Sequence, residues 1–131
     1  MIETVRLSQE ARDHLITLKR YTGIKNWNTL CRWAFCLSLR EPSSPPVHPL
    51  ITDSTIEMTW RVFAGRHADL YWALLVERCR RDRLPLNPDT LAEQFKLHLH
   101  RGIGYMMGDR QLRSIDALFA ALRDKDVDPR A

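Results

Sequence analysis

Apolar positions recur at helical spacing through the first forty residues, after a short extended stretch that ends at Ser8. Ser8 is a favourable N-cap, and apolar side chains then follow three or four residues apart until Gly23, a residue type that commonly ends a helix. A second helix is predicted from Asn26 or Asn28 to about Arg40. Because this helix is apolar nearly all round, we expect it to be the most buried element. The N-terminal order is therefore strand, helix, glycine turn, helix.

Extended stretches and helical patterns alternate in the rest of the chain. Residues 41–50 contain four prolines and are predicted to form an extended linker. Apolar and polar residues then alternate from Ile56 to Val62, which predicts a half-buried strand. Three more helices are expected: one from about Arg66 to Arg83, one from the start signal Asn87-Pro88-Asp89 to Gly102, and one from Asp109 with Leu112, Ile115, Phe119 and Leu122 inward.

These elements predict a mainly α fold, a compact bundle of about five helices with short extended segments and an N-terminal strand–helix–helix unit. The chain has 131 residues, 44% of them hydrophobic, and is long enough to bury one sizeable core. We expect a single domain over residues 1–123, with the linker 41–50 inside it. Residues 124–131 are expected to be a flexible tail.

The composition is typical of a soluble protein. No apolar run approaches the roughly 18 residues that a membrane span requires, and the first residues lack the charged and apolar regions of a secretory signal. The three cysteines are an odd number, which argues against a disulfide framework and fits a reducing compartment. We therefore expect a cytoplasmic protein.

Basic residues outnumber acidic ones, 20 against 16, and arginine supplies 16 of the 20. The planar guanidinium pairs with phosphate or carboxylate through two parallel hydrogen bonds. The charge is uneven, because residues 1–40 hold seven bases and three acids, whereas residues 41–60 hold three acids and no base. Local basic surfaces are expected near the N-terminus and at residues 78–83, although helix arginines also commonly form a solvated, salt-bridged face.

The segment 96–108 combines two histidines and an arginine with glycines at 102, 104 and 108, which are expected to break the helix. Histidines two positions apart on a helix point roughly 200° apart. His98 and His100 therefore cannot bind one metal ion together. We expect His98 to be a hydrogen-bonded core residue. His100 and Arg101 are expected to contact an anion, a partner chain or DNA.

No motif indicates a cofactor or a metal ion. The sequence has no P-loop, dinucleotide fingerprint or zinc-protease motif. No nucleophile or orienting carboxylate lies at a telling distance from the histidines. Cys31 and Cys36 lie in the most apolar predicted helix, where cysteine usually packs as a small hydrophobic residue. We expect no cofactor, no metal site and no enzymatic activity.

Two separated segments resemble the signatures of one family, DndE, the small DNA sulfur modification (phosphorothioation) proteins. The first runs from Leu18 to Ile24 and continues through Asn28 to Ala34 and Leu37 to Leu39. The second runs from His98 to Tyr105. Two signatures in the right order are far more specific than either one, and together they span most of the chain.

The resemblance implies a mainly helical, non-catalytic subunit of the machinery that replaces a non-bridging phosphate oxygen of DNA with sulfur. It implies a homotetramer that binds duplex DNA and prefers nicked DNA. The implied partners are a cysteine desulfurase, a PAPS-reductase-like enzyme and an SMC-like ATPase. The DNA-binding candidates are Arg6, Lys19, Arg20, Lys25, Arg32, Arg78, Arg80, Arg81, Arg83, His100 and Arg101. The candidates for close subunit packing are Gly23, Gly102 and Gly104.

Three other functions stay open at this point. A nickase or nuclease would use His98 or His100 with Arg101. A scaffold would dock its arginines on acidic surfaces of the other sulfur modification proteins. A ribbon-helix-helix regulator shares the strand–helix–helix order, with Thr4, Arg6 and Ser8 facing DNA.

Overall fold

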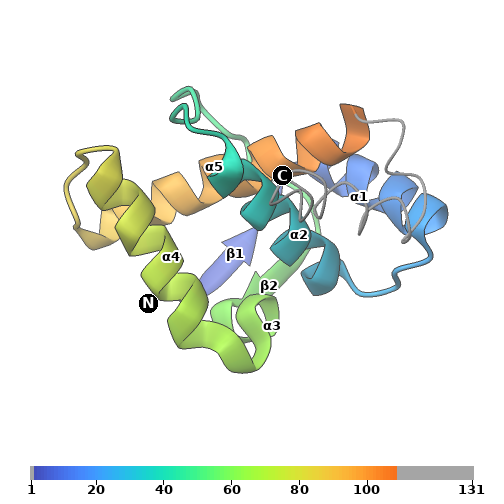
Figure 1. The fold of residues 1–131 in the computed structure, drawn as a ribbon. Helices are drawn as coiled ribbons and strands as arrows, with labels where there is room; N and C mark the ends of the chain where they lie inside the picture. The colour runs from blue at the N-terminus through green and yellow to red at the C-terminus, as the bar shows by residue number, and fades with distance from the viewer. Residues whose placement is uncertain (1, 109–131) are drawn as a thin grey trace, which may run out of the picture.

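The computed structural model describes residues 2–108 and is mainly helical, which confirms the predicted fold class (Figure 1). In chain order its elements are β1 (Thr4–Arg6), α1 (Gln9–Thr22), α2 (Trp27–Arg40), β2 (Glu57–Thr59), α3 (Trp60–Ala64), the 3-10 turn η1 (Gly65–His67), α4 (Ala68–Arg81) and α5 (Pro88–Gly108). The helix predicted from Asp109 and the tail 124–131 lie outside the described residues.

The first helix begins and ends at the residues that its sequence indicates. The Ser8 hydroxyl accepts a hydrogen bond from the Ala11 amide at 3.1 Å. At the other end, Gly23 adopts a left-handed φ of 75° and donates its N–H to the Lys19 carbonyl. Glycine adopts this conformation without steric cost, so α1 stops there. The short turn that follows places the end of α1 beside the start of α2.

The predicted strand from Ile56 to Val62 is correct only in its first half. β2 pairs antiparallel with β1, and Val5 lies opposite Met58. The strand ends at Thr59 because its hydroxyl accepts a hydrogen bond from the Val62 amide and caps α3. Trp60 and Phe63 are buried, but they belong to the helix α3 and not to the predicted strand.

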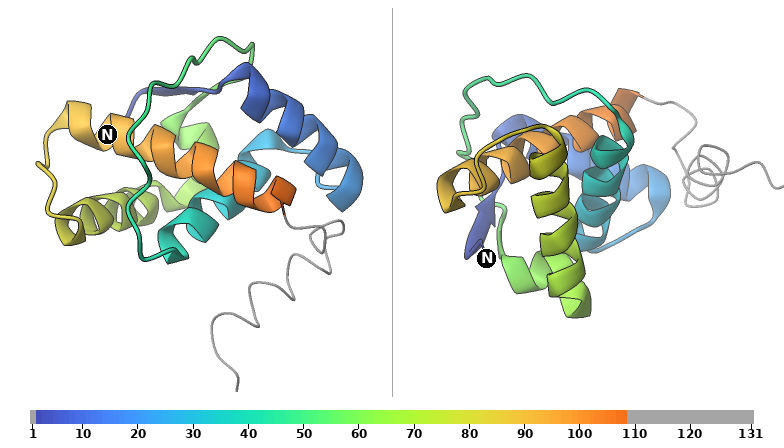
Figure 2. Two further views of the ribbon diagram at one scale, coloured as in Figure 1. Left: turned by 90° about the horizontal axis from the view of Figure 1, so that it is seen from above. Right: turned by 60° about the vertical axis from the view of Figure 1, so that its left-hand side comes forward.

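The core forms where α2, α3 and α5 meet. Phe35, Phe63 and Phe95 are all fully buried. Their ring centroids lie 4.8 Å apart for Phe63 and Phe95 and 5.2 Å apart for Phe35 and Phe95. Such tilted and edge-on pairs add to the stabilisation from apolar burial. Figure 2 shows α5 crossing the whole molecule, with α4 beside its beginning and α1 beside its end.

The fourth predicted helix begins as expected but does not end at Gly102. The Asn87 side chain accepts a hydrogen bond from the Thr90 amide at 2.8 Å and caps α5. The helix then continues through Gly102 and Gly104 to Gly108. A Cβ added at Gly102 would lie 1.7 Å from the Ala34 carbonyl oxygen in α2. Glycine is required here for the close approach of two helices, and the packing outweighs its low helix propensity.

Residues 41–56 connect α2 to β2 without helix or strand, as the prolines predict. This connection arches over α5 before it returns to β1 and β2 (Figures 1 and 2). Among residues 2–108, no helix is both long enough and apolar enough to cross a membrane.

Candidate nucleic-acid interface

Three of the predicted DNA contacts gather at the turn between α1 and α2. Lys19 and Arg20 lie in the last turn of α1, where positive charge complements the helix dipole. Lys25 follows in the turn, and both Arg20 and Lys25 are exposed. The Lys19 ammonium lies 3.8 Å from the centroid of the Trp27 ring, a cation–π contact that fixes its position.

The start of α2 adds to the positive potential of this turn. Asn26 occupies the cap position without a side-chain capping bond, and the first turn of α2 holds no acid. The first amides of the helix and the positive end of its dipole are therefore uncompensated by carboxylates. A groove of about 440 Å³ runs from this turn between α1 and β2, and its lining includes Arg12, Lys25 and the acidic Glu57.

Arg12 is absent from the residues that the sequence pointed to. It lies seven positions before Lys19, which places both side chains on the same face of α1. That spacing is the signal from which it could have been found.

Arg6 and Arg32 are engaged within the fold. Arg6 forms an ion pair with Glu57, which lies opposite it in the β1–β2 register, and its side chain is half exposed. Arg32 donates to the Phe63 carbonyl at 2.8 Å and to the Thr29 hydroxyl at 3.3 Å. Arg32 therefore connects α2 to α3, whereas Arg6 connects β1 to β2 and stays half exposed.

A second exposed basic group lies at the corner between α4 and α5. Arg80 forms an ion pair with Glu77, and Arg81 and Arg83 are exposed. Figure 1 shows the α4–α5 corner and the α1–α2 turn at opposite ends of the molecule. The structure therefore does not join the two predicted basic patches into one surface on a single protomer.

Arg78 departs from its prediction as a phosphate contact, because it is 5% exposed. Its guanidinium donates at 2.8 Å to the carbonyls of Leu39, Glu41 and Ser43 and at 3.0 Å to the Asp82 carboxylate. Leu39 lies in the last turn of α2, where carbonyls lack partners within the helix. Arg78 thus closes the end of α2, a role that depends on residues 35 to 39 positions earlier.

Arg101 has a similar internal role, and its expected contact with an anion, a partner chain or DNA stays a prediction. Its Nε donates to the Ser38 hydroxyl at 2.8 Å, one Nη to the Ser38 carbonyl at 2.7 Å, and the other to the Ser43 carbonyl at 2.8 Å. Arg78 and Arg101 therefore converge on Ser43 from two helices. Both fasten the end of α2 and the beginning of the connection that follows it.

His98 is the hydrogen-bonded core histidine that the sequence predicted. It is fully buried, and its Nδ1 lies 2.8 Å from the Ser38 hydroxyl. Burial, together with the charges of Arg78 and Arg101, lowers the pKa of His98 to about 4, so it is neutral at pH 7. A serine–histidine pair resembles a nucleophile with its base, but Ser38 and His98 are both 0% exposed. The pair has no surface on which to meet a substrate.

His100 joins α5 to the start of α1. Its Nε2 accepts a hydrogen bond from the Ser8 amide at 3.1 Å, and its Nδ1 donates to the Lys96 carbonyl at 2.7 Å. Burial lowers the pKa of His100, which favours this neutral tautomer. Both ring nitrogens thus have partners within residues 2–108, and the expected contact with an anion, a partner chain or DNA stays a prediction.

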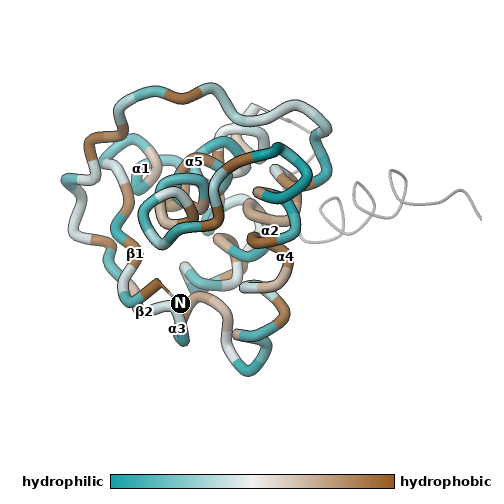
Figure 3. Tube along the Cα trace, turned by 90° about the vertical axis from the view of Figure 1, so that its left-hand side faces the viewer, coloured by the Kyte–Doolittle hydropathy of each residue, from teal (hydrophilic) through white to brown (hydrophobic). Residues whose placement is uncertain are grey.

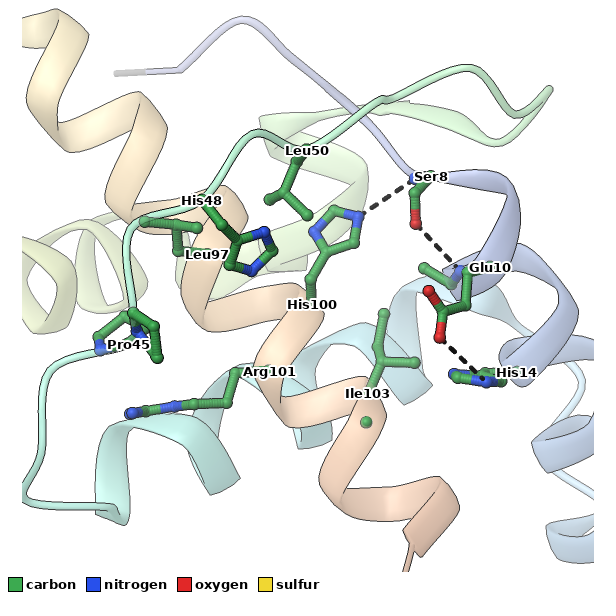
Figure 4. A pocket seen from close by; sticks show the side chains of 13 residues that line it. Ser8, Glu10, His14, Pro45, His48, Leu50, Leu97, His100, Arg101 and Ile103 are labelled. Carbon is green, nitrogen blue, oxygen red and sulfur yellow. Dashed lines mark hydrogen bonds and ion pairs between the residues drawn. The ribbon is translucent and has the colours of Figure 1, made fainter.

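A cavity of about 250 Å³ lies beside His100. Figure 4 shows it between the start of α1, the connection after α2 and the middle of α5. His14, His48 and Leu50 are among the other residues that line it. No three His, Cys, Asp or Glu side chains within residues 2–108 are grouped as a metal site.

The three glycines predicted at subunit contacts have different surroundings. Gly102 packs against the Ala34 backbone of its own chain, so its close contact is within the protomer. Gly23 ends α1 with its left-handed φ and has no atom within 4 Å of an added Cβ. Gly104 is exposed and likewise open. Only Gly23 and Gly104 leave free space at the surface for another chain.

Comparison with known proteins adds the family. A family model described as DNA sulphur modification protein DndE matches residues 4–114. No curated protein matches the chain. The crystal structure of DndE from Escherichia coli B7A, involved in DNA phosphorothioation modification, has a TM-score of 0.67 and 25% identity and covers 81% of this chain and 98% of that one.

A second crystal structure, of a DndE variant with glycines replaced by lysine, has a TM-score of 0.65 at 20% identity. It covers 83% of this chain and 100% of that one and supports the fold. The family match extends from β1 beyond the end of α5 and thus includes both segments that resemble DndE signatures. The chain belongs to the DndE family of DNA sulphur modification proteins.

Proposed function

We propose that this protein is a non-catalytic DNA-binding subunit of the cytoplasmic DNA phosphorothioation machinery. It holds duplex DNA, preferentially nicked, on the basic surfaces of a homotetramer. It works beside a cysteine desulfurase, a PAPS-reductase-like enzyme and an SMC-like ATPase and needs no cofactor of its own. Family membership supports the general role, since the DndE of Escherichia coli B7A is involved in DNA phosphorothioation modification.

The observation that carries DNA binding is the group of cations around the α1–α2 turn. Arg20 and Lys25 are exposed, Arg12 and Lys25 line one groove, and the uncapped start of α2 adds its dipole. Cations so arranged bind phosphates and release counterions without reading base sequence. Arg80, Arg81 and Arg83 form a second, distant group, so assembly of several protomers would bring more than one basic surface to a duplex.

The nickase alternative finds little support in the histidines. His98 is fully buried, and both ring nitrogens of His100 are hydrogen-bonded within the chain. A general base needs a lone pair that reaches its substrate. Neither imidazole presents one at the surface, which favours the non-catalytic proposal.

Fluorescence anisotropy with intact and singly nicked duplexes across a salt series, together with mass by light scattering, tests the proposal. We expect a tetramer that binds the nicked duplex more tightly, with affinity that falls steeply as salt rises and both DNAs recovered uncut. Absence of binding at low salt would contradict the DNA-binding role and favour a scaffold. Recovery of cut DNA would instead support the nickase or nuclease alternative.

The matched variants are Arg20→Ala/Lys25→Ala and, as a control, Arg61→Ala/Arg66→Ala. All four residues are exposed, and each pair removes two charges, but Arg61 and Arg66 lie in α3 and η1. We expect the first pair to weaken binding and lower its salt dependence more than the control does. An equal effect of the two pairs would show that net charge alone, and not the α1–α2 turn, determines the affinity.

A further inference from the structure

Residues 42–52, named here the proline arm, are fixed to the fold at both ends. At the beginning, the Ser43 carbonyl accepts hydrogen bonds from Arg78 and Arg101, each at 2.8 Å. Just beyond the other end, Asp53 accepts from the Gln9 amide at 3.1 Å and Ser54 donates to the Leu7 carbonyl at 3.1 Å. The arm is therefore held at both ends by hydrogen bonds to the helical part of the fold.

The middle of the arm also packs against the fold. Pro45 is buried, and Pro45 and Leu50 line the cavity beside His100 on α5 (Figure 4). Proline restricts the backbone of four of the eleven residues before any partner binds. A partner would therefore pay little conformational entropy to bind the arm in this form.

The outward side of the arm carries no Asp, Glu, Lys or Arg and combines apolar side chains with the exposed Ser43, Ser44 and His48. Val47 is 75% exposed and Ile51 73%, more than any other large hydrophobic side chain in the described part of the chain. Pro46, directly before Val47, and Pro49, between Val47 and Ile51, are also exposed. Residues 42–52 contain no Asp, Glu, Lys or Arg, although charged residues make up 27% of the chain. Figure 3 shows this arc standing away from the helices, with hydrophobic stretches along it.

The arm's backbone is also free for a partner. Among residues 2–108, the backbone of residues 44–52 makes one hydrogen bond, between the Pro49 carbonyl and the His48 ring. An extended, proline-rich segment with a solvated backbone is the form that shallow aromatic grooves bind, by stacking on prolines and apolar side chains and by donating to carbonyls.

We propose that the proline arm is a docking segment for a partner protein that presents a shallow, aromatic-lined groove of the kind that binds polyproline II. Val47 and Ile51 are its apolar anchors, and Pro46 and Pro49 hold them in place. DNA is not the occupant, because the arm offers no cation to neutralise phosphate. The arm arches over α5, apart from the α1–α2 turn and the α4–α5 corner, so one protomer can hold DNA and the partner together.

The test uses Val47→Ser/Ile51→Ser in the full-length protein. Its choice of probes rests on the proposed function: purified cysteine desulfurase, PAPS-reductase-like enzyme and SMC-like ATPase of the same modification system, each titrated separately by calorimetry. We expect one of them to bind the wild type with protection of residues 44–52 from hydrogen exchange at their amides. The double variant should bind it roughly tenfold more weakly or worse.

Leu70→Ser/Leu74→Ser on α4 is the matched control, since it also removes two exposed apolar side chains. It should leave the partner's affinity unchanged, and both double variants should bind nicked DNA like the wild type. The proposal is overturned if none of the three proteins binds or if the binding partner protects other residues. Equal weakening by the arm and control variants would also overturn it. DNA binding is measured separately, so failure of the arm and failure of the DNA-binding proposal remain distinct.

Discussion

Gly102 and Gly104 lie two positions apart on α5 but face different surroundings. A methyl group at Gly102 would overlap the Ala34 carbonyl oxygen, whereas one at Gly104 would meet no atom within 4 Å. Both residues are helical, so the difference between them comes from the neighbouring helix alone. Neither position therefore needs glycine for its backbone conformation. Gly102 alone of the two needs it, because a larger residue would overlap α2.

We predict opposite effects of alanine at these two positions. Gly102→Ala should lower the free energy of unfolding by about 2–3 kcal/mol or more, since backbone cannot move aside as a side chain can. Gly104→Ala should raise it by about 0.5–1 kcal/mol, because alanine has the higher helix propensity. Urea unfolding of both variants measures this, and a similar change in the two would contradict the α2–α5 contact.

The lowered pKa of His98 should make the free energy of unfolding depend on pH. Its pKa is about 4 in the folded chain and 6.5 when unperturbed, so the unfolded chain binds more protons between these values. Stability should therefore fall as the pH drops from 6.5 to 4, by about 3 kcal/mol from this group. His98→Gln should flatten the pH dependence of the urea midpoint. An unchanged pH dependence would show that another group is responsible.

At the scale of elements, two arginines at the end of α2 connect segments that are distant in sequence. Arg78 comes from α4 and Arg101 from α5, and both reach carbonyls at or just beyond the end of α2. A guanidinium suits this position because its five donors lie in one plane and remain charged. We therefore expect these arginines to act on stability and their exposed neighbours to act on DNA binding.

Arg78→Lys should consequently destabilise the protein while Arg81→Lys should not. One ammonium cannot satisfy the carbonyls of Leu39, Glu41 and Ser43 and the Asp82 carboxylate together, and buried acceptors left unpaired cost about 1–3 kcal/mol. We expect a loss in that range for Arg78→Lys by thermal or urea unfolding. Because Arg81 is exposed, its variant serves as the control with the same chemical change.

The whole molecule places its two groups of exposed cations at opposite ends, with the long helix α5 between them. Neither group alone holds many charges. In the proposed homotetramer, contacts from different protomers would act on the same duplex, and their effects on affinity would multiply. Binding should then depend on both ends and on the oligomer.

Neutralising each end separately tests this arrangement. We expect each double variant, Arg20→Ala/Lys25→Ala or Arg81→Ala/Arg83→Ala, to make log K depend less steeply on log salt. The magnitude of the slope should decrease by about 0.9 for every phosphate contact that is lost. The four-fold variant should lose the sum of the two. If Arg81→Ala/Arg83→Ala changes neither affinity nor slope, the α4–α5 corner is not part of the DNA surface.

Local signals in the sequence were sufficient for most helix boundaries. Ser8, Gly23 and Asn87 act through residues within four positions of themselves, so their caps could be predicted from sequence. The roles of Gly102, Arg78 and His100 depend on atoms far along the chain. The Ser8 amide that His100 accepts from is 92 positions away, and no periodicity encodes such a contact.

The candidate DNA contacts divide in the same way. Arg20, Lys25, Arg81 and Arg83 are exposed as their polar positions suggested. Arg78, Arg101 and His100 are held by internal partners, because a basic residue on a helix can face water or a neighbouring carbonyl with the same sequence pattern. The structure was needed to separate these two groups.

The Ser43 carbonyl, shared by Arg78 and Arg101, also has a mechanical consequence. A force applied to the segment that follows Ser43 is transmitted at one oxygen atom to both α4 and α5. A protein pulling there would load two helices at once, through charge-assisted bonds that are stronger than ordinary amide pairs. The connection between α2 and β2 is thus attached near its beginning to both α4 and α5, so a load on it is shared by these two helices.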